Sequence, residues 1–216
     1  MQPILIYCYD AWCGWCYGFS SVMQQLQKKY AERLPIEVLS GGMILPEKPS
    51  PVKIMAPFVL EHYPNVEAVT GVRFGEDFLW HMRNADQSDW FPSSEKPAIA
   101  LAIFKTYLPE RQLDFASDLQ YALFAEGRDL TDDEAYRHLL LKYGIDENAF
   151  YKQLREPSFL EKAKQEFELC RKLQATGFPQ LMLQVSENKI FLITRGYADY
   201  ASVELKIQHI LATILN

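Results

Sequence analysis

The residues of this 216-residue chain whose types and spacing most clearly indicate chemistry are Cys13 and Cys16. They lie near the start of the chain, in the stretch DAWCGWCYGF at residues 10–19. Two cysteines at this spacing can form a redox-active disulfide, supply half of a zinc site, or simply pack as small apolar side chains. The elements that position the two thiols help to separate these three interpretations.

The residues around the motif predict a strand followed by a helix. Residues 3–9, PILIYCY, form a short apolar run rich in strand-forming residues, which is typical of a buried strand. After it, apolar side chains recur at alternating spacings of three and four residues, as they do on one face of a helix. The helix therefore begins at the motif, and its apolar stripe consists of Cys16, Phe19, Met23, Leu26 and Tyr30.

This placement gives the two cysteines different roles. The first turn of a helix has unpaired N–H groups and the positive end of the helix dipole, so it stabilises a thiolate over a thiol. We therefore expect Cys13, at the exposed edge of the turn, to attack a disulfide as the nucleophile. Cys16 lies one turn further along and faces the core, where it can displace the captured partner from the mixed disulfide.

The other candidate ligands do not support a zinc site. Such sites need four nitrogen or sulfur ligands, usually from a second pair of cysteines or from paired Cys and His residues. Cys8 and Cys170 stand alone on apolar stretches, and we expect them to be buried as small apolar side chains. The sequence therefore predicts no metal site. The histidines that lack ligand spacing are His62, His81, His138 and His209.

A second strand and a long helical region follow. Residues 36–42, IEVLSGG, predict a strand that stops at paired glycines, and strand, helix and strand in this order normally close as a right-handed parallel unit. A capping box, TDDE, starts one later helix at Thr131, and Gly127 and Gly144 are predicted to end two helices. The proline-rich connection is residues 45–51, the helical region is 52–155, its predicted helices include 98–108, 115–127 and 131–143, and a loop is predicted at 84–97.

The last part of the chain predicts a helix, two strands and a helix. A capping box, SFLE, opens the first helix at Ser158, and that helix closes near Gly177. The predicted strands are residues 179–185 and 190–196, joined by the hairpin loop SENK, and the final helix covers 200–214. The predicted fold class is α/β, in which β-α-β and α-β-β-α parts flank a helical block.

Composition argues against nucleic acids and membranes as partners. The net charge is -6, the isoelectric point is near 5.3, and Lys and Arg residues are interspersed with acids instead of forming a basic cluster. No apolar run approaches the roughly 20 residues that span a bilayer. The opening residues MQPILIYCYD contain no basic segment of the kind that begins a secretory signal, so we expect a cytoplasmic protein.

Motifs at both ends of the chain resemble the DsbA-like branch of the thioredoxin fold. The stretch YDAWCGWCYGF at 9–19 resembles the opening motif of that family, and TGFPQLML at 176–183 resembles the loop before its third strand. Weaker similarity links the chain to a cytosolic subgroup of predicted protein-disulfide isomerases, related to polyketide-associated DsbA-like proteins. The stretches similar to that subgroup are SGG at 40–42, TGVRFGEDF at 70–78 and EGRDLTDDE at 126–134.

The resemblance implies a thioredoxin-like domain with a helical insertion and a thiol-disulfide oxidoreductase activity on peptides or proteins. Cys13 would be the attacking cysteine and Cys16 the resolving one. Pro179 would be cis, and Phe178 would offer backbone hydrogen bonds to an extended substrate. No bound cofactor is implied, and glutathione is a candidate thiol donor. The implied domain is residues 1–45 and 156–216, the insertion is 46–155, and the substrate-binding apolar rim is Trp12, Trp15, Tyr17 and Phe178 with Pro179.

Two positions depart from the family pattern. Thioredoxin and DsbA have a buried acid six residues before the attacking cysteine, where this chain has Tyr7. We therefore expect proton transfer to and from Cys16 to use water or the Tyr7 hydroxyl. The dipeptide Gly14-Trp15 lacks the histidine that helps DsbA to hold its thiolate, so we expect a less oxidising centre than that of DsbA.

Two other functions remain open at this point. Kappa-type glutathione transferases and hydroxychromene-carboxylate isomerases share this fold and use glutathione on small aromatic substrates. These relatives typically have serine at the position of Cys13 and no resolving cysteine, so the complete CxxC argues against them. The third hypothesis is a redox-switched holdase that binds unfolded partners through the apolar rim without catalysis.

Overall fold

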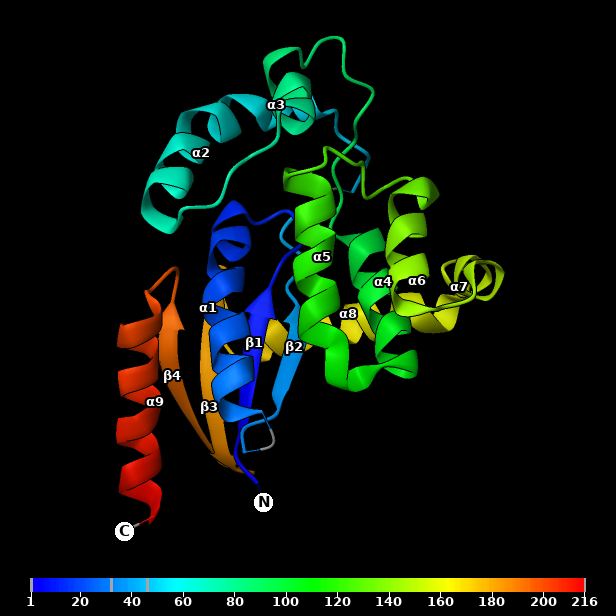
Figure 1. Ribbon diagram of the computed structural model, residues 1–216. Helices are drawn as coiled ribbons and strands as arrows, with labels where there is room; N and C mark the ends of the chain where they lie inside the picture. Colours follow the sequence, from blue (N-terminus) through cyan, green and yellow to red (C-terminus); the bar gives the residue numbers. More distant parts are fainter. Residues whose placement is uncertain (1, 32, 46, 216) are drawn as a thin grey trace.

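The computed structural model describes residues 2–31, 33–45 and 47–215, and its centre is a four-stranded sheet in the order β2-β1-β3-β4 (Figure 1). β1 runs parallel to β2 and antiparallel to β3, and β3 runs antiparallel to β4. The strands are β1 (Ile4–Tyr9), β2 (Ile36–Ser40), β3 (Gln180–Ser186) and β4 (Lys189–Arg195). The predicted α/β class and the β-α-β and α-β-β-α parts are confirmed.

Helices cover both faces of this sheet. α1 (Gly14–Tyr30) and α9 (Tyr200–Leu215) lie on one face, and α8 (Pro157–Lys172) lies on the other (Figure 1). Side chains of β1 alternate between the two faces, as the period of two in a strand requires. Tyr7 packs in the large core on the α1 side, whereas Cys8 packs in a smaller cluster on the α8 side.

The helices between β2 and α8 lie beside and above the sheet in Figure 1. α5 packs against α1 and β2, and α4 packs against α8, so this region contacts helices on both faces of the sheet. Pro46, at the predicted start of the insertion, lies outside the described residues. The elements are η1 (Val52–Ile54), α2 (Ala56–Thr70), α3 (Glu76–Arg83), α4 (Glu95–Tyr107), η2 (Pro109–Arg111), α5 (Gln112–Phe124), η3 (Asp133–Tyr136), α6 (Arg137–Tyr143) and α7 (Glu147–Gln153).

Two predicted helix starts are wrong. Thr131 does not cap a helix, because its hydroxyl and its N–H both bond to Asp129, each at 2.8 Å, and a 3-10 turn capped by Asp132 precedes α6. Ser158 does not cap α8, which begins one residue earlier at Pro157. Proline is well suited to the first helical position because it lacks the N–H that would be unpaired there.

Helix ends are closer to the predictions. Gly144 ends α6 in the left-handed conformation, with φ of 66°, as predicted. Gly127 is also left-handed, at φ 67°, but α5 itself ends earlier, at Phe124. The predicted loop at 84–97 is shorter than expected because α4 already begins at Glu95, and α8 ends at Lys172, before Gly177.

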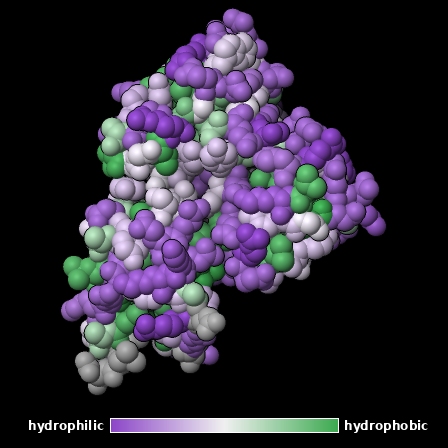
Figure 2. Space-filling model, viewed as in Figure 1, coloured by the Kyte–Doolittle hydropathy of each residue, from purple (hydrophilic) through white to green (hydrophobic). Residues whose placement is uncertain are grey.

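The face of the molecule in Figure 2 is mostly hydrophilic, with apolar side chains in small separate groups. Across residues 2–31, 33–45 and 47–215, no helix combines the length and apolar character that crossing a bilayer requires. The same residues contain no cluster of three or more His, Cys, Asp or Glu side chains that could bind a metal ion.

Candidate active site

Cys13 is the N-cap residue of α1, so its side chain lies at the end of the helix where N–H groups are unpaired. Its Sγ accepts a hydrogen bond from the Cys16 N–H at 3.1 Å and, as a thiol, donates to the carbonyl oxygen of Phe178 at 3.4 Å. Both cysteines are free thiols in the structure. The predicted dithiol therefore lies against the loop that precedes β3.

Cys13 is less accessible than the sequence suggested. Only 5% of its surface is exposed, and Cys16 is completely buried. The expected exposed position of Cys13 is wrong because two distant segments approach it. Gln120 of α5 donates to the Cys13 carbonyl oxygen at 3.4 Å, and Phe178 approaches the sulfur. A substrate disulfide therefore has to enter at the small exposed edge of the sulfur.

The Phe178–Pro179 peptide bond is cis, as the family resemblance implies. The Phe178 ring packs against the backbone of Gly41, directly after β2. A Cβ atom at Gly41 would lie 2.0 Å from this ring, so only glycine permits the contact. The Phe178 carbonyl oxygen is held beside the sulfur through this packing.

The four predicted rim aromatics separate into two groups. Trp12 is 3% exposed, and its Nε1–H donates to the Ser93 carbonyl oxygen at 2.9 Å. Tyr17 is 7% exposed, and its hydroxyl donates to the Arg73 carbonyl oxygen at 3.1 Å. Trp15 and Phe178 are half-buried. The expected solvent-facing position of Trp12 and Tyr17 is wrong because both side chains bond to the backbone of the insertion.

The resolving cysteine lies in surroundings that favour its neutral form. Burial, the hydrogen bond with Cys13 and the charge that Cys13 can carry raise the pKa of Cys16 well above its usual range. Tyr7 faces both thiols from β1, and burial raises its pKa as well. The Tyr7 hydroxyl is buried and has no hydrogen-bond partner with normal geometry. These surroundings therefore favour the thiol form of Cys16, and we expect it to lose its proton only after Cys13 has reacted.

No protein-family profile matches this chain, and no curated protein does. The solved structures are informative. The chain is similar to the "putative protein disulfide isomerase" of Nitrosomonas europaea, with a TM-score of 0.84 and 22% identity over 99% of both chains. It is also similar to the cytosolic disulfide reductase DsbM of Pseudomonas aeruginosa, with a TM-score of 0.72 and 24% identity over 96% of this chain and 99% of that one.

The chain has the DsbA-like thioredoxin fold. DsbM has also been solved with glutathione (GSH), and that structure matches with a TM-score of 0.70 and 25% identity over 95% of this chain and 98% of DsbM. A 2-hydroxychromene-2-carboxylate isomerase matches with a TM-score of 0.63 and 12% identity over 98% of this chain and 95% of that one. The fold therefore accommodates more than one kind of chemistry.

In this DsbA-like fold, the sequence predictions missed three polar residues around the dithiol, namely Asp10, Ser94 and Gln120. Asp10 lies three residues before Cys13 and is 1% exposed. Its carboxylate accepts a hydrogen bond from the Ser94 hydroxyl at 2.8 Å, and its carbonyl oxygen accepts one from Gln120 at 3.0 Å. An acid directly after a buried strand was a visible signal for Asp10. Ser94 and Gln120 lie far from the motif in the sequence, and no sequence signal linked them to it.

A hollow of about 580 Å³ lies beside the loop that follows β2. Leu45 and Phe167 line it, and both pack against Gly42, the neighbour of the glycine that contacts Phe178. Lys164 also lines it.

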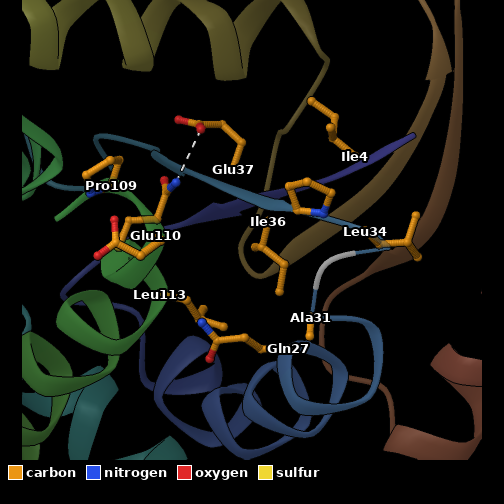
Figure 3. Close-up of a pocket in the computed structure, with 11 residues that line it drawn as sticks. Ile4, Gln27, Ala31, Leu34, Ile36, Glu37, Pro109, Glu110 and Leu113 are labelled. Carbon is orange, nitrogen blue, oxygen red and sulfur yellow. Dashed lines mark hydrogen bonds between the residues drawn. The ribbon is translucent and has the colours of Figure 1, made fainter. Parts of the chain in front are cut away.

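A second hollow, of about 440 Å³, lies elsewhere, between the end of α1 and the start of α5 (Figure 3). Two of its polar side chains are already paired. The Gln112 amide bonds to Glu37 at 3.4 Å and to the Val38 N–H at 2.9 Å, and Glu37 also pairs with Lys105 at 2.9 Å. Neither thiol of the CxxC lines it.

Proposed function

We propose that this protein is a thiol-disulfide oxidoreductase that reduces or isomerises disulfides in peptides or proteins. The observation that carries the proposal is the position of the Cys13 sulfur. It lies between an N–H of the helix N-terminus and the carbonyl oxygen next to cis-Pro179, with a second thiol one turn below. Nucleophile, electrostatic support and resolving group therefore occupy one site.

The reaction follows from this arrangement. The Cys13 thiolate attacks one sulfur of the substrate disulfide, which forms a mixed disulfide and releases the other substrate sulfur as a thiolate. Cys16 then loses its proton and attacks the Cys13 sulfur, which forms the Cys13–Cys16 disulfide and releases the second substrate thiolate. The substrate gains two electrons and the enzyme loses them, and an external thiol must return them.

We further propose that the protein works in the cytoplasm and that glutathione is this external thiol. Support comes from DsbM, which is described as a cytosolic disulfide reductase and was solved with glutathione. Trp15 and Phe178, both half-buried, offer an extended substrate apolar contacts beside the dithiol. These features suit peptide segments more than a compact aromatic substrate.

The similarity to the hydroxychromene-carboxylate isomerase keeps a glutathione-dependent isomerase as the second candidate. The two candidates differ in what they require of Cys16. An isomerase has no use for a resolving thiol, whereas disulfide reduction stops at the mixed disulfide without one. On a model peptide disulfide without added glutathione, which could itself attack the mixed disulfide, we expect Cys16→Ala to accumulate that mixed disulfide on Cys13, detectable by mass spectrometry.

A turnover assay on the same peptide disulfide tests the proposal. Wild-type protein with glutathione should reduce the peptide disulfide through many turnovers, and Cys13→Ser should not. Tight glutathione binding without disulfide turnover would support the isomerase. Suppression of protein aggregation that is unchanged in Cys13→Ser and Cys16→Ser, without turnover, would support the holdase.

A further inference from the structure

The buried carboxylate of Asp10 connects three segments of the chain. It accepts hydrogen bonds from the N–H of Trp12 at 3.0 Å, from the N–H of Met43 at 2.7 Å and from the hydroxyl of Ser94 at 2.8 Å. The Ser94 hydroxyl in turn accepts the N–H of Ile44 at 2.9 Å. Each of these three partners donates to Asp10, which is the bonding pattern of an ionised carboxylate, although burial raises the pKa of Asp10 above its usual value against the lowering effect of these hydrogen bonds.

The backbone of Asp10 fixes the other side of the turn. Its carbonyl oxygen accepts hydrogen bonds from the Cys13 N–H at 3.1 Å and from the Gln120 side chain at 3.0 Å. The same Gln120 amide also reaches the Cys13 carbonyl oxygen at 3.4 Å. Both ends of the turn that carries the nucleophile are therefore held by the insertion, through Ser94 at one side and Gln120 at the other.

Asp10 also supports the opposite wall of the site. Its bond to Met43 holds the loop after β2, and that loop begins with Gly41, against which the Phe178 ring packs. The Phe178 carbonyl oxygen lies 3.4 Å from the Cys13 sulfur. One carboxylate thus fixes both the turn that presents the sulfur and the loop that supports its acceptor.

We propose that Asp10 is a positioning residue for thiol-disulfide exchange. It holds the Cys13 sulfur within hydrogen-bond distance of the Cys16 N–H and of the Phe178 carbonyl oxygen. The proposal rests on the proposed function but concerns a residue to which that function assigns no step. Displacement of a reacting atom by about 1 Å can slow a reaction by about a hundredfold. The three anchors on Asp10 prevent such a displacement.

The Asp10 charge has a second effect, on the resolving thiol. The titratable groups that face Cys16 are Cys13 and Asp10 from the turn and Tyr7 and Tyr9 from β1. Burial raises the pKa of both tyrosines well above the usual value, so they remain neutral. Burial dominates the raised pKa of Cys16, and the Asp10 charge acts in the same direction. Removal of that charge should let Cys16 ionise at a lower pH.

The test uses dithiobis(nitrobenzoate), an aromatic disulfide that releases one coloured thiolate in each of two steps. The first release reports the attack by Cys13, and the second reports displacement by Cys16. Cys8 and Cys170 are buried and should not react on this timescale. Asp10→Asn removes the charge and turns one acceptor oxygen into a donor. Ser94→Ala keeps the charge but removes one anchor.

The matched control is Asp118→Asn. Asp118 lies on α5 with Gln120, and its carboxylate pairs with Lys142 at 2.7 Å and with the Tyr143 hydroxyl at 2.7 Å, within the insertion. This variant weakens the insertion without touching the turn. It therefore separates a general loss of stability from loss of the specific anchor. Circular dichroism and the unfolding midpoint establish that each variant is folded.

We expect Asp10→Asn to slow the first release by about tenfold or more, because an anchor and a matched hydrogen bond to a charged group are lost. The second release should also shift its pH midpoint downward. Ser94→Ala should slow the first release by a smaller factor and leave the pH midpoint unchanged. Asp118→Asn should match the wild type in both steps.

A folded Asp10→Asn protein that matches the Asp118→Asn control in both steps would overturn the proposal. If Asp10→Asn does not fold, a Ser94→Ala protein whose first release equals that of the control overturns it instead. Failure of the proposed function looks different. In that case the wild type gives no turnover on peptide disulfides, while the first release still compares the variants.

Discussion

The chain has two cysteine pairs on opposite faces of the same sheet, and their surroundings differ in kind. Cys13 lies at the N-terminus of α1 and its sulfur accepts an N–H hydrogen bond. Cys170 lies near the C-terminus of α8, behind the sheet, and its thiol points to the carbonyl oxygens of Ser40 at 3.5 Å and of Leu39 at 4.0 Å. Cys8 of β1 is its neighbour.

The comparison shows that proximity and burial of two thiols do not make a redox centre. Both Cys13 and Cys170 face carbonyl oxygens, which favour a thiol, so the difference lies in the N–H donor and the positive end of the helix dipole at Cys13, which favour a thiolate. Hydrogen bonding with Cys8 and burial raise the pKa of the Cys170 thiol far above its usual value. We therefore expect Cys170, behind the sheet, to react far more slowly with disulfides than the CxxC pair does.

The largest predicted effect separates the two pairs by activity. Cys13→Ser should lower turnover of a peptide disulfide by about a thousandfold or more, because serine cannot form the mixed disulfide. Cys170→Ser should leave turnover within about twofold of the wild type. Steady-state rates with glutathione as the reductant measure both. A strong loss of turnover in a folded Cys170→Ser protein would break the comparison.

The second prediction concerns the reduction potential. The Cys13 sulfur has one backbone N–H donor, and Trp15 stands where DsbA has a helpful histidine. A weakly supported thiolate makes a less oxidising disulfide, so the potential should be clearly more negative than the value of about −120 mV for DsbA. A glutathione-buffered titration measures it.

The same titration also tests whether Cys8 and Cys170, the pair behind the sheet, are redox-active. We expect a single two-electron transition, which disappears in Cys13→Ser. A second transition that persists in this variant and disappears in Cys170→Ser would show that the buried pair is redox-active. A potential near the DsbA value would show that some other contact stabilises the Cys13 thiolate.

Much of the difference between the two cysteine pairs could be predicted from the sequence. The CxxC spacing at the start of an apolar helical stripe predicted a dithiol at the start of α1, and the apolar run of residues 3–9 predicted that Cys8 is buried. The period of a strand or a helix fixes which face a residue occupies, and that information is local. The cis-proline came from the family resemblance and not from local pattern.

The anchors of the reactive turn could not be predicted in this way. Ser94 is 84 residues from Asp10 and Gln120 is 110 residues from it, and no periodic pattern links polar residues over such separations. The predicted rim positions of Trp12 and Tyr17 were wrong for a related reason. Each has an apolar body and a polar end, so either fits a rim or a buried contact until the insertion supplies an acceptor.

The third prediction is a loss of stability without loss of function. Cys170→Ala removes a buried sulfur from the small cluster behind the sheet, and the remaining space should lower the free energy of unfolding by about 1–2 kcal/mol. Urea unfolding of the reduced protein measures this change. Turnover at low urea should remain that of the wild type. A variant of equal stability would show that the cluster around Cys170 collapses to fill the space.

The fourth prediction concerns an effect that the two pairs share. Folding raises the pKa of both Cys16 and Cys170, while the unfolded thiols ionise near pH 8.5. Above that pH the unfolded chain loses protons that the folded protein retains, so the free energy of unfolding falls by about 1.4 kcal/mol per pH unit for each such thiol. Below it, their contribution is complete and constant.

Urea unfolding of the reduced protein between about pH 7.5 and about pH 9.5 measures this slope, below the range in which tyrosines ionise. Cys16→Ala and Cys170→Ala should each reduce the slope by one proton, and the double variant should reduce it by two. If only Cys170→Ala changes the slope, Cys16 ionises in the folded protein as readily as in the unfolded chain. The reactive pair would then consist of two available thiolates, and the resolving step would need no prior attack by Cys13 to release the Cys16 proton.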